Sequence, residues 1–224
     1  MNALVLFDID GTLLRNSGGW HRRALEGAAR KVLGVDATLD GIPTSGCLDR
    51  DLIRIMLSNA GVSAAGIKRS MQAMMDEAQR IYLSTCPSLR KRVTPGSRML
   101  LYRLHQRHVP AGLVTGNLTR IGWHKMESAG LRRYLRYGAF AELASTRAGL
   151  VKLAVAEARR EGWIDRHATI SLIGDHPNDI QAAKANGVQS IAVGTGLVGM
   201  EALRREQPDV LVEDLRSLQV KQLI

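Results

Sequence analysis

Two aspartates, Asp8 and Asp10, stand directly after an apolar run that begins at Ala3. An unbroken apolar run of this length is typical of a buried central strand in a parallel sheet. Two carboxylates this close together repel each other unless a cation or a proton lies between them. Taken alone, however, Asp-Ile-Asp-Gly is also typical of an ordinary turn, so the pair indicates a site only if other segments deliver reactive groups to the same place.

Two further apolar runs end in polar sequences. The run at 109–114 is followed by Thr-Gly-Asn at 115–117, and the run at 169–173 is followed by Gly-Asp at 174–175. Ligands of open parallel sheets bind beyond the carboxyl ends of the strands, so we expect these side chains to meet at one edge. Carboxylates crowded there need a hard divalent cation, and magnesium is the usual choice for phosphate chemistry. The predicted Mg²⁺ ligands are Asp8, Asp10, Asp175 and Asp179.

An α/β sheet and an inserted helical block are the elements that would hold these residues in place. From Pro95 onward, apolar runs alternate with helical patterns, which predicts βαβ units. We expect a Rossmann-like, mostly parallel sheet with helices on both faces. The segment before Pro95 and after the first strand has helical patterns and no strand pattern. We therefore predict an α/β core at residues 1–16 and 92–224, interrupted by an all-helical cap at residues 17–91.

The composition restricts the partners of this chain. Of its 224 residues 45% are apolar, and no apolar stretch reaches the roughly 18 residues that a membrane span needs. The net charge of +10 favours anionic ligands, but the basic residues are scattered, so we do not expect nucleic acid or a membrane as a partner. Cys47 and Cys86 match no metal-binding spacing and are expected to be free thiols of a cytoplasmic protein. We expect a monomer or a homodimer.

The order and spacing of the motifs resemble those of the haloacid dehalogenase (HAD) superfamily. The sequence FDIDGTLL at 7–14 is similar to its first motif, residues 115–117 to its second, and Gly174-Asp175 with Asp179 to its fourth. The helical block lies where this family carries a cap. The likeness is greatest to the phosphoglycolate phosphatase-like and β-phosphoglucomutase-like branch. In this family an acid at the position of Asp10 separates phosphatases and phosphomutases from dehalogenases.

The resemblance implies a role for each motif residue. Asp8 would attack phosphorus and form an aspartyl-phosphate. Asp10 would protonate the leaving oxygen, later activate water, and bind Mg²⁺ through its backbone carbonyl. Asp175 would be a carboxylate ligand of Mg²⁺, and Asp179 would bind the ion or orient a water. The residues expected to bind phosphate are Gly11, Thr12, Thr115, Gly116 and Asn117, with Gly116 permitting close approach of the phosphoryl group.

The third motif departs from the family pattern, which places a Lys, often followed by Pro, at a set distance before the metal-binding aspartate. Arg147 precedes Asp175 by 28 residues, which matches that distance, and Lys152 precedes it by 23. Spacing favours Arg147 as the cation that balances the nucleophile and the phosphoryl group, and arginine suits bidentate phosphate binding. Lys152 is the alternative. The expected catalytic residues are Asp8, Asp10, Thr115 and Arg147 or Lys152.

Substrate choice in this family depends on the cap and on the loop after Asp10. The candidates for substrate contact here are Arg15, Asn16, His21, Arg22 and Asp49. A moving cap would exclude water and then readmit it, and we expect hinges at Gly18-Gly19 and at 94–96. Asn178 is expected to cap the helix that follows Asp175.

The leading hypothesis is a Mg²⁺-dependent phosphatase that hydrolyses a small phosphorylated metabolite of the phosphoglycolate or sugar-phosphate type. A phosphomutase of the β-phosphoglucomutase type would use the same residues and is the alternative. An inactive binding protein would not need all of the carboxylates, and a nucleic-acid binder is supported only by the net charge.

Overall fold

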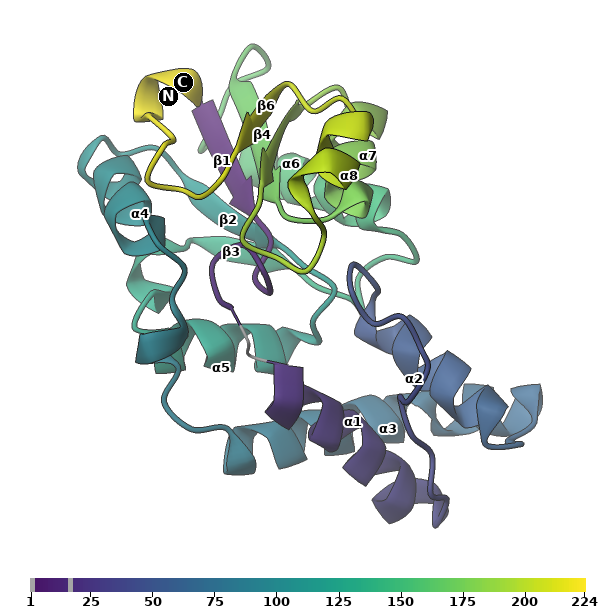
Figure 1. Ribbon diagram of the computed structural model, residues 1–224. Helices are drawn as coiled ribbons and strands as arrows, with labels where there is room; N and C mark the ends of the chain where they lie inside the picture. The colour runs from purple at the N-terminus through teal and green to yellow at the C-terminus, as the bar shows by residue number, and fades with distance from the viewer. Residues whose placement is uncertain (1–2, 16–17) are drawn as a thin grey trace.

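The central feature of the computed structural model, which describes residues 3–15 and 18–224, is a parallel sheet. Within these ranges six strands lie in the order β3-β2-β1-β4-β5-β6 (Figure 1). β1 lies between β2 and β4 and is buried on both faces, as its unbroken apolar sequence predicts. The strands are β1 (Ala3–Phe7), β2 (Ala111–Val114), β3 (Tyr137–Ala139), β4 (Thr169–Gly174), β5 (Gln189–Val193) and β6 (Val210–Val212).

Helices cover both faces of the sheet. α4 and α5 pack on the face that carries Val5 and Phe7, while α6 and α7 pack on the face that carries Leu4 and Leu6. This arrangement confirms the predicted fold class. The helices are α1 (Gly18–Leu33), α2 (Asp49–Asn59), α3 (Ala64–Thr85), α4 (Ser97–Gln106), α5 (Thr119–Ala129), α6 (Arg147–Arg160), α7 (Pro177–Ala185) and α8 (Met200–Arg205), with the short 3-10 helices η1 (Arg90–Arg92), η2 (Arg132–Tyr134) and η3 (Val220–Gln222). Among the described residues, none of these helices combines the length and apolar character needed to cross a membrane.

α1, α2 and α3 form a separate helical layer, which lies below the sheet in Figure 1. Met74 and Tyr82 of α3 are fully buried in the core that this layer shares with α6 and α7. The layer is inserted between β1 and β2, as predicted for the cap. The domain boundaries at 16/17 and 91/92 stay a prediction, and the first falls on residues outside the described ranges.

The two predicted hinges do not lie in open loops. Gly18 and Gly19 belong to the first turn of α1. Gly96 has a φ of +88°, and a Cβ there would come within 2.4 Å of the backbone nitrogen of Arg216. Thr94 donates its hydroxyl to the carbonyl oxygen of Thr12 at 2.5 Å. The segment 94–96 is thus in contact with the core, and its role as a hinge stays a prediction.

Candidate active site

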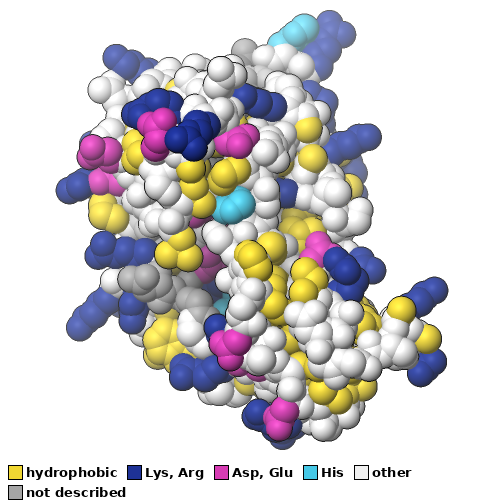
Figure 2. Space-filling view, turned by 45° about the vertical axis from the view of Figure 1, so that its right-hand side comes forward, with side chains coloured by type: hydrophobic (Ala, Val, Ile, Leu, Met, Phe, Trp, Pro, Cys, Tyr) yellow, Lys and Arg dark blue, Asp and Glu magenta, His cyan; other side chains and the backbone are white. Residues whose placement is uncertain are grey.

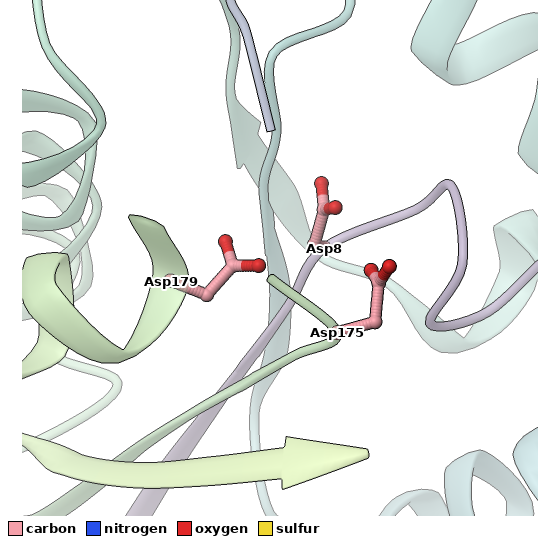
Figure 3. A group of neighbouring side chains, drawn as sticks. All are labelled: Asp8, Asp175 and Asp179. Carbon is pink, nitrogen blue, oxygen red and sulfur yellow. The ribbon is translucent and has the colours of Figure 1, made fainter. Parts of the chain in front are cut away.

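Three buried aspartates meet at the carboxyl edge of the sheet (Figure 3). Asp8 follows β1, Asp175 follows β4, and Asp179 lies in the first turn of α7. Each contributes one carboxylate oxygen to a group whose members lie within 4.8 Å of one another. These three side chains therefore lie close together, as the positions of the strand ends predict.

Glycines on two neighbouring segments make room for Asp175. Gly11 has a φ of +88°, and a Cβ there would lie 2.1 Å from Oδ2 of Asp175. A Cβ on Gly196 would lie 1.7 Å from the same atom. Thr12 donates its hydroxyl to Oδ1 of Asp175 at 3.0 Å. Gly11 and Thr12, which we expected to bind phosphate, are thus in contact with a predicted metal ligand.

The three carboxylates oppose one another's ionisation. Burial, together with the charges of Asp8 and Asp179, raises the pKa of Asp175 to about 8. Burial also raises the pKa of Asp179 to about 7, although the charge of Arg147 opposes that shift. Within the described part of the chain, Oδ1 of Asp179 accepts no hydrogen bond. Crowded, buried oxygen donors with unused acceptor capacity fit a hard divalent cation such as Mg²⁺, which would relieve the repulsion.

Arg147 is in contact with this cluster. It is the first residue of α6, whose start is fixed where the Thr146 side chain accepts a hydrogen bond from the Gly149 amide at 3.0 Å. Nη1 of Arg147 lies 3.2 Å from Oδ1 of Asp8 and 2.8 Å from Oδ1 of Asp179, without the alignment of a hydrogen bond. Burial alone would lower the pKa of Arg147, but the carboxylates of Asp179 and Asp8 outweigh it and raise that pKa.

The two alternatives for the third motif occupy different places on the same helix. Lys152 is exposed on α6, whereas Arg147 is buried against the carboxylates. The structure therefore brings Arg147, and not Lys152, to the predicted nucleophile. A guanidinium in this place can face a carboxylate and a phosphoryl group at once, because its donors form a fixed fork.

The carboxylate of Asp10 is held outside this cluster by a second set of polar side chains. Its two oxygens lie 2.8 and 2.6 Å from Nζ of Lys125. Oδ2 of Asp10 also accepts a hydrogen bond from Nδ2 of Asn117 at 2.8 Å. The Asp10 side chain is 37% exposed, whereas Lys125 is fully buried. A carboxylate held at the rim of the site suits proton transfer, while the role of the Asp10 carbonyl as a metal ligand stays a prediction.

Lys125 is the site residue that the sequence reasoning missed. It lies on α5 and shares the buried face of that helix with Ile121, Met126 and Ala129. A lysine on an otherwise apolar face needs a buried partner, because an unpaired buried charge is costly. Its position on that face was therefore a usable signal for a polar site, although helical periodicity could not name the partner.

The second motif faces the cap. Asn117 donates its Nδ2 to Oγ1 of Thr115 at 2.7 Å, and both side chains are buried. A Cβ on Gly116 would lie 2.1 Å from the carbonyl oxygen of Cys47 in the loop before α2. The amide of Asp49 donates to the carbonyl of Gly116 at 2.8 Å. Gly116 therefore makes room for the cap loop, which is a different close approach from the phosphoryl contact that we expected.

Two of the predicted specificity residues reach the site from the cap. His21 of α1 places Nδ1 3.2 Å from Nζ of Lys125 and Nε2 2.8 Å from Oδ2 of Asp49. Asp49 is buried at the start of α2, and its Oδ2 also accepts the amide of Leu118 at 2.8 Å. His21 and Asp49 thus join the cap to both the first and the second motif.

The other specificity candidates are not drawn into this network. Arg22 pairs with Glu26 at 2.9 Å and with Asp40, all within the cap. The side chain of Arg15 is exposed. Asn16 lies outside the described residues. Of the specificity candidates among the described residues, His21 and Asp49 therefore belong to the site, whereas Arg22 forms ion pairs within the cap.

The start of α7 also contacts the cap. Our prediction that Asn178 caps this helix is wrong, because the N-cap is His176, whose Nδ1 accepts the amide of Asn178 at 3.2 Å. Oδ2 of Asp179 accepts the amide of His176 at 3.2 Å and completes a capping box. The Asn178 side chain instead donates to the carbonyl of Gly46 at 2.8 Å.

Figure 2 shows a hollow between the core and the cap, with acidic side chains visible within it. A cavity of ≈ 410 Å³ lies between the loop before α2 and the starts of α6 and α7. Its lining includes Gly46, Cys47, Thr146, Arg147 and Asn178. Arg147 thus lines this cavity and also contacts the aspartate cluster.

A family model described as haloacid dehalogenase-like hydrolase matches residues 5–184, which span the three aspartates and the cap. The chain belongs to this family. A relative that matches most of this chain is a phosphoglycolate phosphatase of Synechococcus elongatus. The two sequences are 27% identical over 93% of this chain and 92% of the relative. A phosphoglycolate phosphatase of Pseudomonas fluorescens is 24% identical and covers 96% of this chain and 78% of that one. These relatives make this HAD chain an enzyme of the phosphatase type.

Solved structures of HAD proteins share its fold. A predicted phosphatase from Clostridium acetobutylicum has a TM-score of 0.71 at 19% identity and covers 100% of this chain and 99% of that one. A β-phosphoglucomutase from Clostridium difficile has a TM-score of 0.68 at 17% identity, covering 99% and 95%. These structures show the fold, and together with the relatives named phosphoglycolate phosphatase they support the phosphoglycolate phosphatase-like and β-phosphoglucomutase-like branch of the HAD family.

Proposed function

We propose that this chain is a Mg²⁺-dependent phosphatase of a small phosphorylated metabolite, of the phosphoglycolate or sugar-phosphate type, that works through an aspartyl-phosphate on Asp8. The observation that carries the proposal is the buried cluster of Asp8, Asp175 and Asp179 with Arg147 against it. Asp10 is held separately, as an acid that serves the leaving group must be. The relatives named phosphoglycolate phosphatase support the substrate class.

In the first half-reaction, a carboxylate oxygen of Asp8 attacks phosphorus while the bond from phosphorus to the ester oxygen breaks. Asp10 gives its proton to that oxygen, so the leaving group departs as an alcohol and Asp10 becomes a carboxylate. Arg147 faces the charge that the phosphoryl group carries throughout. Mg²⁺ held by Asp8, Asp175 and Asp179, and by the Asp10 carbonyl, would neutralise the charge on the phosphoryl oxygens.

In the second half-reaction, the Asp10 carboxylate takes a proton from water, and the water oxygen bonds to phosphorus. The bond between phosphorus and Asp8 breaks, which releases inorganic phosphate. Asp8 returns to its carboxylate form and Asp10 to its protonated form, so the enzyme is ready for a second ester. Water must reach Asp10 at this stage, and its partly exposed side chain is consistent with that need.

A panel of phosphate esters, assayed for phosphate release with Mg²⁺ and with a chelator, tests the proposal. We expect release from 2-phosphoglycolate or from a sugar phosphate, and its loss when the metal is removed. Absence of release from every ester in the presence of Mg²⁺ would contradict the proposal. An isomerised sugar phosphate formed without free phosphate would identify a phosphomutase instead.

The proposal also includes a cytoplasmic location. Cys47 and Cys86 are both unpaired thiols, as expected for a reducing compartment. Sedimentation of the purified protein would decide between the monomer and the homodimer that the sequence leaves open.

A further inference from the structure

Lys125 is a buried ammonium group whose hydrogen bonds all go to the site. It is fully buried on α5, and its ammonium group has three protons to donate. Four atoms lie within hydrogen-bond distance of its nitrogen, namely the two carboxylate oxygens of Asp10 at 2.8 and 2.6 Å, Oδ1 of Asn117 at 2.6 Å and Nδ1 of His21 at 3.2 Å. The face of the Tyr82 ring lies 5.8 Å from the same nitrogen. The ammonium group is therefore in contact with the acid of the core and with the first helix of the cap.

The contacts of His21 fix its hydrogen-bonding roles. Nδ1 faces the ammonium of Lys125, which can only donate, so Nδ1 must be the acceptor. Nε2 then carries the proton and donates it to Oδ2 of Asp49 at 2.8 Å. The same oxygen accepts the amide of Leu118 in the core. A neutral imidazole thus connects the cap to α5 at two places, directly at Lys125 and through Asp49 at the amide of Leu118.

We propose that Lys125 is a positioning residue, which holds the carboxyl group of Asp10 in place for the leaving group and is itself oriented by His21 of the cap. The inference rests on the proposed function and extends it, because it assigns a role to a residue outside the motifs. The core offers the ammonium group of Lys125 the two carboxylate oxygens of Asp10 and Oδ1 of Asn117, and Nδ1 of His21 adds a fourth group from the cap. The acid and the cap are in this way connected through one side chain.

A purely structural role for Lys125 makes a different prediction. A lysine that only stabilises the fold would affect every substrate equally, through the amount of folded enzyme. In the first half-reaction, which kcat/KM reports, a lysine that positions Asp10 affects only those esters whose leaving oxygen needs a proton. The Asp10 side chain is 37% exposed, and removing Lys125 takes away the contacts that hold both of its carboxylate oxygens. General acid catalysis contributes on the order of 10²- to 10⁴-fold, so the difference between substrates should be measurable.

The test compares two esters on the variant Lys125→Met. 4-Nitrophenyl phosphate has a weakly basic leaving group that departs without a proton, whereas 2-phosphoglycolate or the best alkyl phosphate of the wild type has a strongly basic one. We expect kcat/KM for the alkyl ester to fall by at least about 10-fold more than for the aryl ester. The ratio of the two constants does not depend on how much of the variant is folded. Lys31→Met, at an exposed lysine of α1, is the matched control and should leave the ratio unchanged.

A second pair of variants tests the link to the cap. His21→Asn keeps an acceptor near the position of Nδ1, whereas His21→Leu removes it. We expect His21→Leu to shift the substrate ratio in the same direction as Lys125→Met, and His21→Asn to shift it less. This pair also carries the test if Lys125→Met yields too little folded protein to assay.

The outcomes separate this inference from the proposed function. If the wild type hydrolyses both esters but Lys125→Met lowers both constants by one factor, or lowers neither, Lys125 does not position the acid. The same conclusion follows if His21→Leu and His21→Asn leave the ratio at the wild-type value. A wild type that hydrolyses no ester would contradict the proposed function itself.

Discussion

Replacing Arg147 by Met should strengthen the electrostatic repulsion among the buried carboxylates, because the charge of Arg147 offsets part of it. Arg147 is buried, and its Nη1 lies 3.2 Å from Asp8 and 2.8 Å from Asp179. Removing one partner of a buried ion pair costs about 3–5 kcal/mol, because the remaining charge is left buried without a partner. Without Mg²⁺, we therefore expect Arg147→Met to lower the free energy of unfolding by about 3–5 kcal/mol.

The pH dependence of this loss follows from the carboxylates. Burial raises the pKa of Asp175 to about 8 and that of Asp179 to about 7, and removing Arg147 takes away a charge that opposes both shifts. At low pH both groups are protonated and the missing cation matters little. As the pH rises through these values the carboxylates ionise in the native state, so the loss in the variant grows.

Urea unfolding of wild type and variant, with a chelator and at about pH 5.5 and about pH 9, measures the effect. Added Mg²⁺ should recover part of the loss at the higher pH, because the ion supplies positive charge to the same oxygens. Lys152→Met is the matched control, and as an exposed substitution it should stay within about 0.5 kcal/mol of wild type. A stable Arg147→Met, or a loss that is equal at both pH values, would refute this account of the cluster.

Three further predictions concern the predicted metal ligands. The pKa values of Asp175 and Asp179 are raised from 3.8 to about 8 and about 7, so their contribution to stability is present below about pH 4 and lost as the pH rises through 7 to 8. The gain in Tm from Mg²⁺ should therefore increase from about pH 6 to about pH 9 in a melting series. An equal gain at every pH would argue against this prediction. Thr12→Val removes the hydroxyl that donates to Asp175 and should weaken Mg²⁺ binding by about 10- to 100-fold in calorimetry, whereas unchanged affinity would show that this hydrogen bond has no part in it. Gly11→Ala should lower the free energy of unfolding by more than about 1–3 kcal/mol, because a Cβ 2.1 Å from Asp175 adds a steric clash to the backbone strain at a φ of +88°. The control Gly34→Ala lies in open space at a φ of +66°, so it should show only the loss from backbone strain. Equal losses of stability in the two variants would contradict the clash.

Much of the fold and the aspartate cluster could be predicted because both depend on simple patterns. An unbroken apolar strand such as β1 has to lie in the middle of a sheet, and parallel strands bring their ends to one edge. Asp8 and Asp175 follow directly on such strands, so their proximity follows from topology alone. Arg147 could be favoured over Lys152 by its distance along the chain, and the structure places it accordingly.

The contacts between core and cap could not be predicted in the same way. Helical periodicity shows that Lys125 lies on a buried face, but its partners Asp10 and His21 are 115 and 104 residues away. Gly116 was correctly singled out as a place of close approach, but only the folded chain shows that Cys47 is what approaches it. Side chains that pair across separately folded layers leave no regular spacing in the sequence.

The phosphatase activity of Asp8→Asn tests the central claim most directly. The substitution keeps the shape of the side chain and removes the nucleophilic carboxylate, so the variant should fold and bind but should not form the aspartyl-phosphate. Phosphate release from the best ester of the wild type, measured with Mg²⁺, should fall on the order of 10³-fold or more. Mass spectrometry of acid-quenched wild type should find the phosphoryl group on Asp8. An Asp8→Asn enzyme with full activity would contradict the account.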